Sequence, residues 1–119
     1  MQIIHARAAD TATAQPTETF TGTVFMDTVL PATDDVRVNT VTFTPGARTH
    51  WHTHARGQLL IVVAGTGFIQ LRGEEARPIR CGDSVWISPD EEHWHGAGPD
   101  SLLVHTAVSL GETSWLEAV

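Results

Sequence analysis

The sequence predicts an all-β fold in a single domain, built as an antiparallel sandwich or barrel. Three observations support this prediction: Val, Thr, Ile and Phe recur in short runs, Gly, Pro or Asp interrupts these runs, and no helical stripe of useful length appears. The chain has 119 residues, which is enough for one hydrophobic core and too few for two. We therefore expect one domain over residues 1–119.

Each predicted strand is bounded by residues that commonly end strands. The expected strand segments are 19–30 before Pro31, 36–43 before Thr-Pro-Gly, 58–65, 68–73, 76–88 before Pro89, and 101–110 before Gly111. The intervening Ala-Gly-Thr-Gly-Phe stretch resembles a hairpin turn, because Gly tolerates the positive φ that tight turns need. The barrel is thus expected in residues 19–110.

The two ends of the chain have a different character. Residues 1–18 are rich in Ala and Thr, and we interpret them as an arm or as an edge strand exchanged with a partner. Residues 111–119 are expected to form a short docking segment. Open strand edges and a loose arm together favour a homo-oligomer, either a dimer or a tetramer.

Composition narrows the possible partners and chemistry. The formal net charge is −7, which argues against nucleic acid or an anionic membrane surface as a partner. The first residues lack an apolar stretch of signal-peptide length, and the longest apolar run is far shorter than the ~20 residues of a membrane span. These features favour a cytoplasmic location. A single cysteine, Cys81, excludes an intrachain disulfide and a cysteine-rich zinc site. The absence of lysine and tyrosine leaves acid–base chemistry to His, Asp or Glu.

Six of the seven histidines are grouped in a pattern that suits strands. His50, His52 and His54 alternate with other residues, as do His93 and His95. Alternate residues of a strand point to the same face, so these five imidazoles are expected to converge on one cavity. The sixth, His105, shares its face with small apolar residues that suit a cavity wall.

The clustered imidazoles predict a metal site. Imidazole is the commonest protein ligand for first-row transition metals, and the ion stays open among Zn, Cu, Fe and Ni. Three such ligands leave coordination positions for water or substrate. The alternative is a set of hydrogen-bonded core histidines, but each buried imidazole without a partner costs on the order of 1–3 kcal/mol.

The spacing of these residues resembles the cupin superfamily. Its first motif, G-x5-H-x-H-x(3,4)-E-x6-G, matches Gly46, His52, His54, Gln58 and Gly65, with Gln in place of Glu. Its second motif, G-x5-P-x-G-x2-H-x3-N, keeps only Gly82 and His93. The resemblance implies a double-stranded β-helix, or jelly roll, and a metal held by His52, His54, Gln58 and His93.

The Glu-to-Gln difference has a physical consequence if Gln58 binds the metal. A neutral carbonyl oxygen beside three neutral imidazoles leaves the dipositive charge of the ion intact, which strengthens its hold on anions. The alternative is that Gln58 is a structural amide and the three imidazoles alone bind.

A narrower resemblance points to the small bacterial cupins that include the manganese-dependent hydroxynitrile lyases. It rests on "VTFTPGART", "WHTH", "GQLLIVVAG", "GDSVWISPDEEHWHGAG" and a late histidine. It implies Mn²⁺, with Fe²⁺, Zn²⁺ or Ni²⁺ as alternatives, and catalytic roles for His95 and His105, with His95 as general base. His50 is not part of this pattern. The small-molecule substrate would lie in a pocket lined by Val41, Phe43, Leu60, Leu103 or Ala107.

Three classes of function remain open at this stage. The first is a lyase that cleaves a cyanohydrin into cyanide and an aldehyde or ketone. The second is a dioxygenase or another small-molecule metalloenzyme, because three neutral imidazoles leave room for O₂. The third is a metal-binding cupin without catalysis. Oxygen consumption and anaerobic cyanide release distinguish them.

Overall fold

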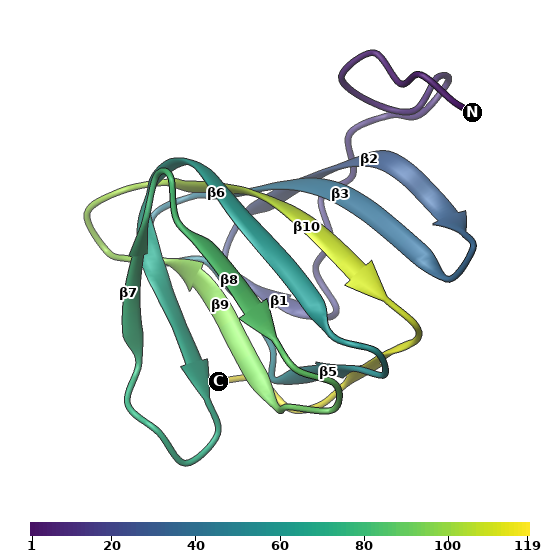
Figure 1. The fold of residues 1–119 in the computed structure, drawn as a ribbon. Helices are drawn as coiled ribbons and strands as arrows, with labels where there is room; N and C mark the ends of the chain where they lie inside the picture. The colour runs from purple at the N-terminus through teal and green to yellow at the C-terminus, as the bar shows by residue number, and fades with distance from the viewer.

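A computed structural model describes residues 1–119 as eleven strands without a helix. One sheet contains β2 (Val24–Thr33), β3 (Val36–Phe43), β8 (Ser84–Ile87), β10 (Leu103–Leu110) and the first half of β6 (Gln58–Leu71). The other contains β1 (Phe20–Thr21), β4 (Arg48–Thr49), β5 (His52–His54), β7 (Arg77–Arg80), β9 (His93–Ala97), β11 (Thr113–Trp115) and the second half of β6. All pairings are antiparallel, and the two sheets face each other as a jelly-roll barrel (Figure 1). No helix is present that could cross a membrane.

Strand β6 joins the two sheets, and it corrects the predicted hairpin turn. The strand runs without interruption from Gln58 to Leu71, pairing with β8 and β10 in one sheet and with β7 and β9 in the other. Gly65 has a φ of +74°, and a Cβ there would lie 1.8 Å from the carbonyl oxygen of Leu102. The glycines therefore bend a continuous strand around a barrel corner, where the neighbouring backbone comes close.

Two other strand predictions need correction. Segment 76–88 is divided into β7 and β8 by a turn at Gly82, whose φ is +95°. Segment 19–30 is divided into β1 and β2 beside Gly22, and β2 continues through Pro31 to Thr33. Pro31 is tolerated because β2 is the last strand of its sheet, where a missing N–H breaks no ladder.

The core lies between the two sheets and follows the alternation of the strands. In β10 every second residue from Leu103 to Ser109 is buried, and the buried apolar cluster joins residues of both sheets, among them Val24, Phe43, Leu60 and Ile79. Phe43 of this cluster also packs against two of the histidines, so the apolar core and the histidines adjoin inside the barrel.

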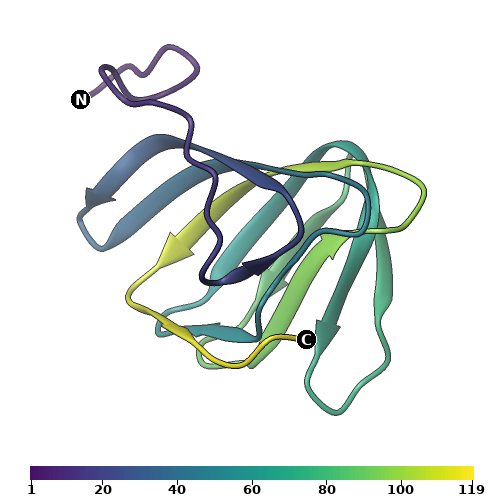
Figure 2. The same cartoon turned by 180° about the vertical axis from the view of Figure 1, so that it is seen from behind.

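The C-terminus lies against the barrel, whereas the first residues form a loop that projects away from it (Figure 2). The N-terminal arm follows β2 through an isolated bridge between Ala14 and Met26 and an ion pair of 3.1 Å between Arg7 and Asp27. Exchange of this arm with a partner stays a prediction. At the other end, β11 pairs with β5, so that the C-terminal segment lies beside the strand that carries two of the histidines.

Candidate metal centre and active site

Five buried imidazoles meet inside the barrel, and they come from three strands. Strand β5 supplies His52 and His54, β9 supplies His93 and His95, and β10 supplies His105; each is at most 3% exposed. The register explains the meeting of the first two strands, because His52 pairs directly with His93. Strand alternation then places His54 and His95 on the same inner face.

His50 does not join this cluster, which corrects the expectation that it would. The chain bends at Trp51 between β4 and β5, so the alternation is interrupted there. Thr49 takes the inward position instead and is 1% exposed. The amide of His50 donates to Thr19, and its carbonyl accepts from the ring of His52 at 2.9 Å. His50 therefore supports a neighbouring imidazole through its backbone.

Hydrogen bonds to the Nδ1 atoms hold the three imidazoles of the predicted ligand set in place. The Nδ1 atoms of His52 and His93 lie 2.9 Å from the carbonyl oxygens of His50 and Glu91. The Nδ1 atom of His54 lies 3.0 Å from the Thr113 hydroxyl. Partners of this kind fix the ring orientation and tautomer of metal-binding histidines. A carbonyl oxygen can only accept, so Nδ1 of His52 and His93 carries the hydrogen and Nε2 of each presents a lone pair.

Gln58 completes this group from the first residue of β6. Its Nε2 donates to the Ser109 hydroxyl at 3.1 Å, which turns its Oε1 toward the imidazoles, 3.2 Å from His93 Nε2. Gln58 Oε1 and His93 Nε2 thus face each other, and each has a lone pair that could bind the same metal ion. The Nε2 atom of His54 is buried without any hydrogen-bond partner. This donor set of three nitrogens and one neutral oxygen suits a divalent transition metal.

A different grouping of the same cluster brings its ring nitrogens closer together than the set with His54 and Gln58. Ring nitrogens of His52, His93 and His95 lie within 4.8 Å of one another. The two groupings share His52 and His93 and differ in whether His54 with Gln58 or His95 completes the set. The Nδ1 atom of His95 is bound by another imidazole rather than by a carbonyl or a hydroxyl, since it lies 3.0 Å from Nε2 of His105.

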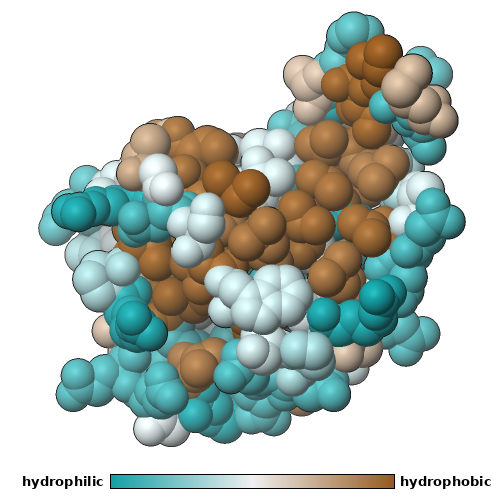
Figure 3. All heavy atoms as spheres, in the orientation of Figure 1, coloured by the Kyte–Doolittle hydropathy of each residue, from teal (hydrophilic) through white to brown (hydrophobic).

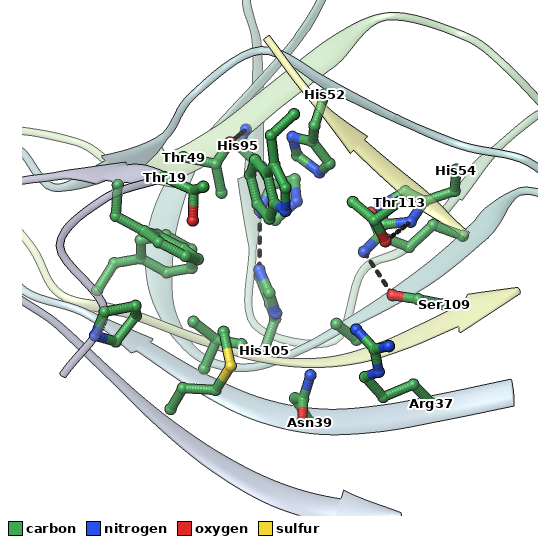
Figure 4. A pocket seen from close by; sticks show the side chains of 18 residues that line it. Thr19, Arg37, Asn39, Thr49, His52, His54, His95, His105, Ser109 and Thr113 are labelled. Atoms are coloured by element: carbon green, nitrogen blue, oxygen red, sulfur yellow. Dashed lines mark hydrogen bonds between the residues drawn. The ribbon is translucent and has the colours of Figure 1, made fainter. Parts of the chain in front are cut away.

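The linked pair of His95 and His105 lies on the opposite side of the cavity from His54 and Ser109 (Figure 4). The two rings pack at a centroid distance of 4.8 Å, and Phe43 lies against both. The Nε2 atom of His95 and the Nδ1 atom of His105 are buried without a partner. One imidazole must donate to the other, so the pair can carry a proton between two positions.

Burial keeps these imidazoles neutral near pH 7. Desolvation is the largest cause in every case: it lowers the pKa of His54 and His105 to about 4, and it holds the pKa of His52 and His95 well below the usual value. The pKa of His93 is also lowered. Neutral imidazole is the form that binds a metal or accepts a proton.

A cavity of about 250 Å³ opens beside the histidines. This volume suits a small molecule. Val41, Phe43 and Ala107 line the cavity as expected, whereas Leu60 and Leu103 belong to the closed core. Most of the wall comes from side chains that the sequence did not single out. These are Pro16, Thr19, Phe20, Met26, Arg37, Asn39, Thr49, Ser109, Thr113 and Trp115.

The C-terminal segment contacts two of the histidines, which the sequence did not predict. Trp115 stacks on His52 with a centroid distance of 4.6 Å, and Thr113 contacts His54. Two backbone hydrogen bonds join Trp51 to Leu116 and Glu117. The only available signal was a Trp within a short polar tail, which does not indicate the strand with which it pairs.

Comparison with known proteins identifies the family. The sequence profile of the cupin domain matches residues 39–107, which is more than half of the chain and includes every histidine of the cluster. The chain belongs to the cupin family. Within it, the (R)-mandelonitrile lyase of Granulicella tundricola is 50% identical over 95 residues, which cover 78% of this chain and 72% of that protein.

Solved structures agree with the fold of this cupin. A cupin-like protein from Thermotoga maritima is 41% identical, covers 94% of this chain and 90% of its own, and superposes with a TM-score of 0.86. The polyketide cyclase RemF from Streptomyces resistomycificus is 16% identical, with coverages of 100% and 85% and a TM-score of 0.78. The second likeness concerns the fold alone.

Proposed function

We propose that this cupin is a metal-dependent lyase that cleaves and forms cyanohydrins, releasing cyanide and an aldehyde or ketone. The observation that carries the proposal is the hydrogen-bonded imidazole pair beside a separate donor set of three imidazoles and one amide. The 50% identity to an (R)-mandelonitrile lyase supports the same reaction class. The ion would be held by His52, His54, Gln58 and His93. We favour Mn²⁺ from the resemblance to the manganese-dependent hydroxynitrile lyases, and a reaction without redox change suits Mn²⁺ or Zn²⁺.

The chemistry divides between the ion and the protein. A divalent metal in this donor set supplies the positive charge that stabilises the departing cyanide or the alkoxide. The protein supplies the base: Nε2 of His95 takes the hydroxyl proton of the cyanohydrin. The bond between the carbinol and nitrile carbons then breaks, its electron pair leaves with cyanide, and the hydroxyl oxygen becomes a carbonyl. Return of the proton from His95 to cyanide gives hydrogen cyanide.

His105 sets the tautomer that this step requires. When Nδ1–H of His95 donates to Nε2 of His105, the Nε2 lone pair of His95 is available to the cavity. When the hydrogen lies on His105 instead, His95 presents N–H and can donate to the carbonyl product. The pair thus serves both directions of the reaction, and we assign His105 as the residue that positions and reprotonates His95.

Mandelonitrile under anaerobic and aerobic conditions tests the proposed activity. Cyanide release at the same rate in both conditions, without oxygen uptake, is the expected result. Oxygen consumption with a dioxygen-dependent product would instead place the protein among oxidative cupins. Metal-replete protein that shows neither activity would contradict an enzymatic role toward this substrate.

A further inference from the structure

One charged side chain, the exposed Arg37, lines the active-site cavity, and the proposed lyase chemistry does not use it. Alternation along β3 directs Arg37, Asn39, Val41 and Phe43 to the barrel interior, and all four line the cavity. Val41 and Phe43 form its apolar floor, being 3% and 0% exposed. Arg37 and Asn39 lie farther along the strand. Arg37 is exposed and Asn39 is half-buried, so this end of the cavity wall is open to solvent.

Arg37 has no partner within the chain. The four ion pairs of the protein use Arg7, Arg56 and Arg72, and the guanidinium of Arg37 makes no hydrogen bond. Figure 4 shows it beside Ser109, with which it is paired in the register of β3 and β10. It is the one permanently charged side chain among the residues of the wall. An unpaired cation in the cavity of a protein with net charge −7 favours an anion there.

Two further hydrogen-bond donors share this wall. The Asn39 side chain lines the cavity and has no hydrogen-bond partner. The Ser109 hydroxyl, opposite Arg37 in the strand register, accepts from Gln58 and so keeps its own O–H free to donate. The guanidinium charge also reaches His54, where it contributes to the lowered pKa of that imidazole.

We infer that Arg37, Asn39 and Ser109 form a subsite for a carboxylate carried by the substrate. The planar guanidinium fork matches a carboxylate in two parallel hydrogen bonds. This inference rests on the proposed function: the preferred substrate is a cyanohydrin, or its aldehyde, whose substituent ends in a carboxylate. The apolar floor of Val41 and Phe43 would hold the body of the substituent, which lies between the reacting carbon and the carboxylate.

Paired aldehydes test the subsite. We would measure kcat/KM for cyanohydrin synthesis from 4-formylbenzoate and 3-formylbenzoate, each relative to benzaldehyde, in wild-type protein, Arg37→Met and Arg37→Lys. The wild type should prefer at least one carboxylated aldehyde. The ratio of kcat/KM for that carboxylated aldehyde to kcat/KM for benzaldehyde should fall by about 10- to 100-fold in Arg37→Met, the usual effect of losing a charge-assisted hydrogen bond. It should fall less in Arg37→Lys. Arg77→Met removes an exposed, unpaired arginine on β7 and should leave the ratio unchanged.

Binding without turnover separates this inference from the proposed reaction. Calorimetric titration with 4-formylbenzoate and benzaldehyde in the absence of cyanide reports recognition alone. Arg37-dependent binding of the carboxylate without any lyase activity would retain the subsite and contradict the lyase. Lyase activity with equal ratios in wild type and Arg37→Met would retain the lyase and overturn the subsite. That second result would also follow if Arg37 merely attracted cyanide.

An independent observation concerns the outer face of the sheet that contains β8, β6, β10, β3 and β2. Strand register brings one apolar residue from each strand into a single row: Trp86, Leu59, Val108, Val38 and Leu30. Trp86 is 53% exposed and the adjacent Ile61 is 37% exposed. Figure 3 shows the hydrophobic surface continuing across this face. Scattered apolar residues are normal on a surface, but a continuous row across five strands is not.

We propose that a second copy of this chain packs on this face. Five strands about 4.8 Å apart, with eight residues each in β3 and β10, give a surface of roughly 24 by 27 Å. That area, about 650 Å², approaches the ~800 Å² that each partner contributes to a standard interface. Asp27 on β2 is paired with Arg7. A sheet face with a continuous apolar row suits face-to-face packing with its own copy.

Sedimentation analysis of matched variants tests this interface. Ile61→Glu and Phe68→Glu replace residues that are both 37% exposed on β6 but lie in different sheets. We expect the wild type and Phe68→Glu to sediment as dimers or larger, and Ile61→Glu combined with Trp86→Glu to sediment as a folded monomer. A monomeric wild type at tens of micromolar, or an unchanged oligomer in the double variant, would overturn the proposal.

Discussion

At the scale of single residues, Gln58 determines the charge of the proposed metal centre. Its amide is oriented by Ser109, so that Oε1 faces His93. Replacement by Glu would add one negative charge at the same position. Gln58→Glu should therefore bind the metal more tightly and bind azide or cyanide more weakly. Anion titrations of both metal-loaded proteins check this, and equal anion affinities would place Gln58 outside the ligand set.

His95 is the residue on which the proposed proton transfer depends. His95→Gln keeps the approximate size and hydrogen bonding, and should lower kcat by roughly 10²- to 10⁴-fold with metal content unchanged. Burial holds the pKa of His95 well below its usual value, so the wild type should stay active below pH 6.5 and lose activity only at more acidic pH. That acidic limb of the pH–rate profile should disappear in the variant.

The same variant distinguishes the two possible ligand sets. His54→Ala should lose bound metal if His54 and Gln58 complete the site, whereas His95→Gln should retain it. The opposite pattern, with metal lost from His95→Gln and kept by His54→Ala, would show that His52, His93 and His95 bind the ion. His95 would then be unavailable as a base.

At the scale of strands, the bend in β6 depends on the close approach of Gly65 to the neighbouring backbone. A Cβ at Gly65 would lie 1.8 Å from the Leu102 carbonyl oxygen, whereas a Cβ at Gly73 would meet nothing within 4 Å, and both residues have positive φ. Gly65→Ala should lower the free energy of unfolding by more than about 3 kcal/mol, and Gly73→Ala by only about 1 kcal/mol. Urea denaturation of both variants checks this, and equal losses would contradict the role of close backbone approach.

The sequence identified strands well but not where a strand bends. The runs at 36–43 and 101–110 correspond to β3 and β10, because turn residues bound them and alternation is regular. Gly65 and Gly67 carried the same local signal as a hairpin. Whether glycines reverse a strand or bend it depends on the backbone that lies against them, here Leu102 and Gly96. That contact is not encoded near the glycines in the sequence.

The site was predictable to a similar degree. The spacing of His52, His54, His93 and His95 was sufficient to expect a shared inner face, since strand alternation alone produces it. His50 shows the limit, because a bend of one residue interrupts the alternation. The wall formed by Trp115 and Arg37 depends on which strands pair, which local patterns do not specify.

At the scale of the whole molecule, burying several neutral imidazoles makes stability depend on pH. Burial lowers the folded-state pKa of His54 and His105 from 6.5 to about 4. Above pH 6.5 their contribution to stability is fully present. As the pH falls toward about 4, the unfolded chain takes up protons that the folded chain excludes, so the free energy of unfolding decreases.

The size of this decrease in the free energy of unfolding follows from the difference between the folded and unfolded pKa values. Between pH 7 and pH 5 each of these two groups should cost the metal-free protein about 2 kcal/mol. Urea midpoints measured in the presence of a chelator check the decrease. His105→Gln should flatten the dependence, whereas His5→Gln, which removes an exposed histidine, should not. A stability that is constant from pH 7 to pH 5 would show that these imidazoles are not buried as described.

Cyanide release from mandelonitrile, measured as metal is restored to chelator-treated protein, tests whether this cupin is a metal-dependent lyase. We predict that anaerobic activity rises in proportion to bound Mn²⁺ and levels off at one ion per chain. His52→Ala and His93→Ala, which each remove one imidazole of the set, should bind little metal and release little cyanide. Equal cyanide release by metal-free and metal-loaded protein, or full metal binding by either variant, would contradict the account.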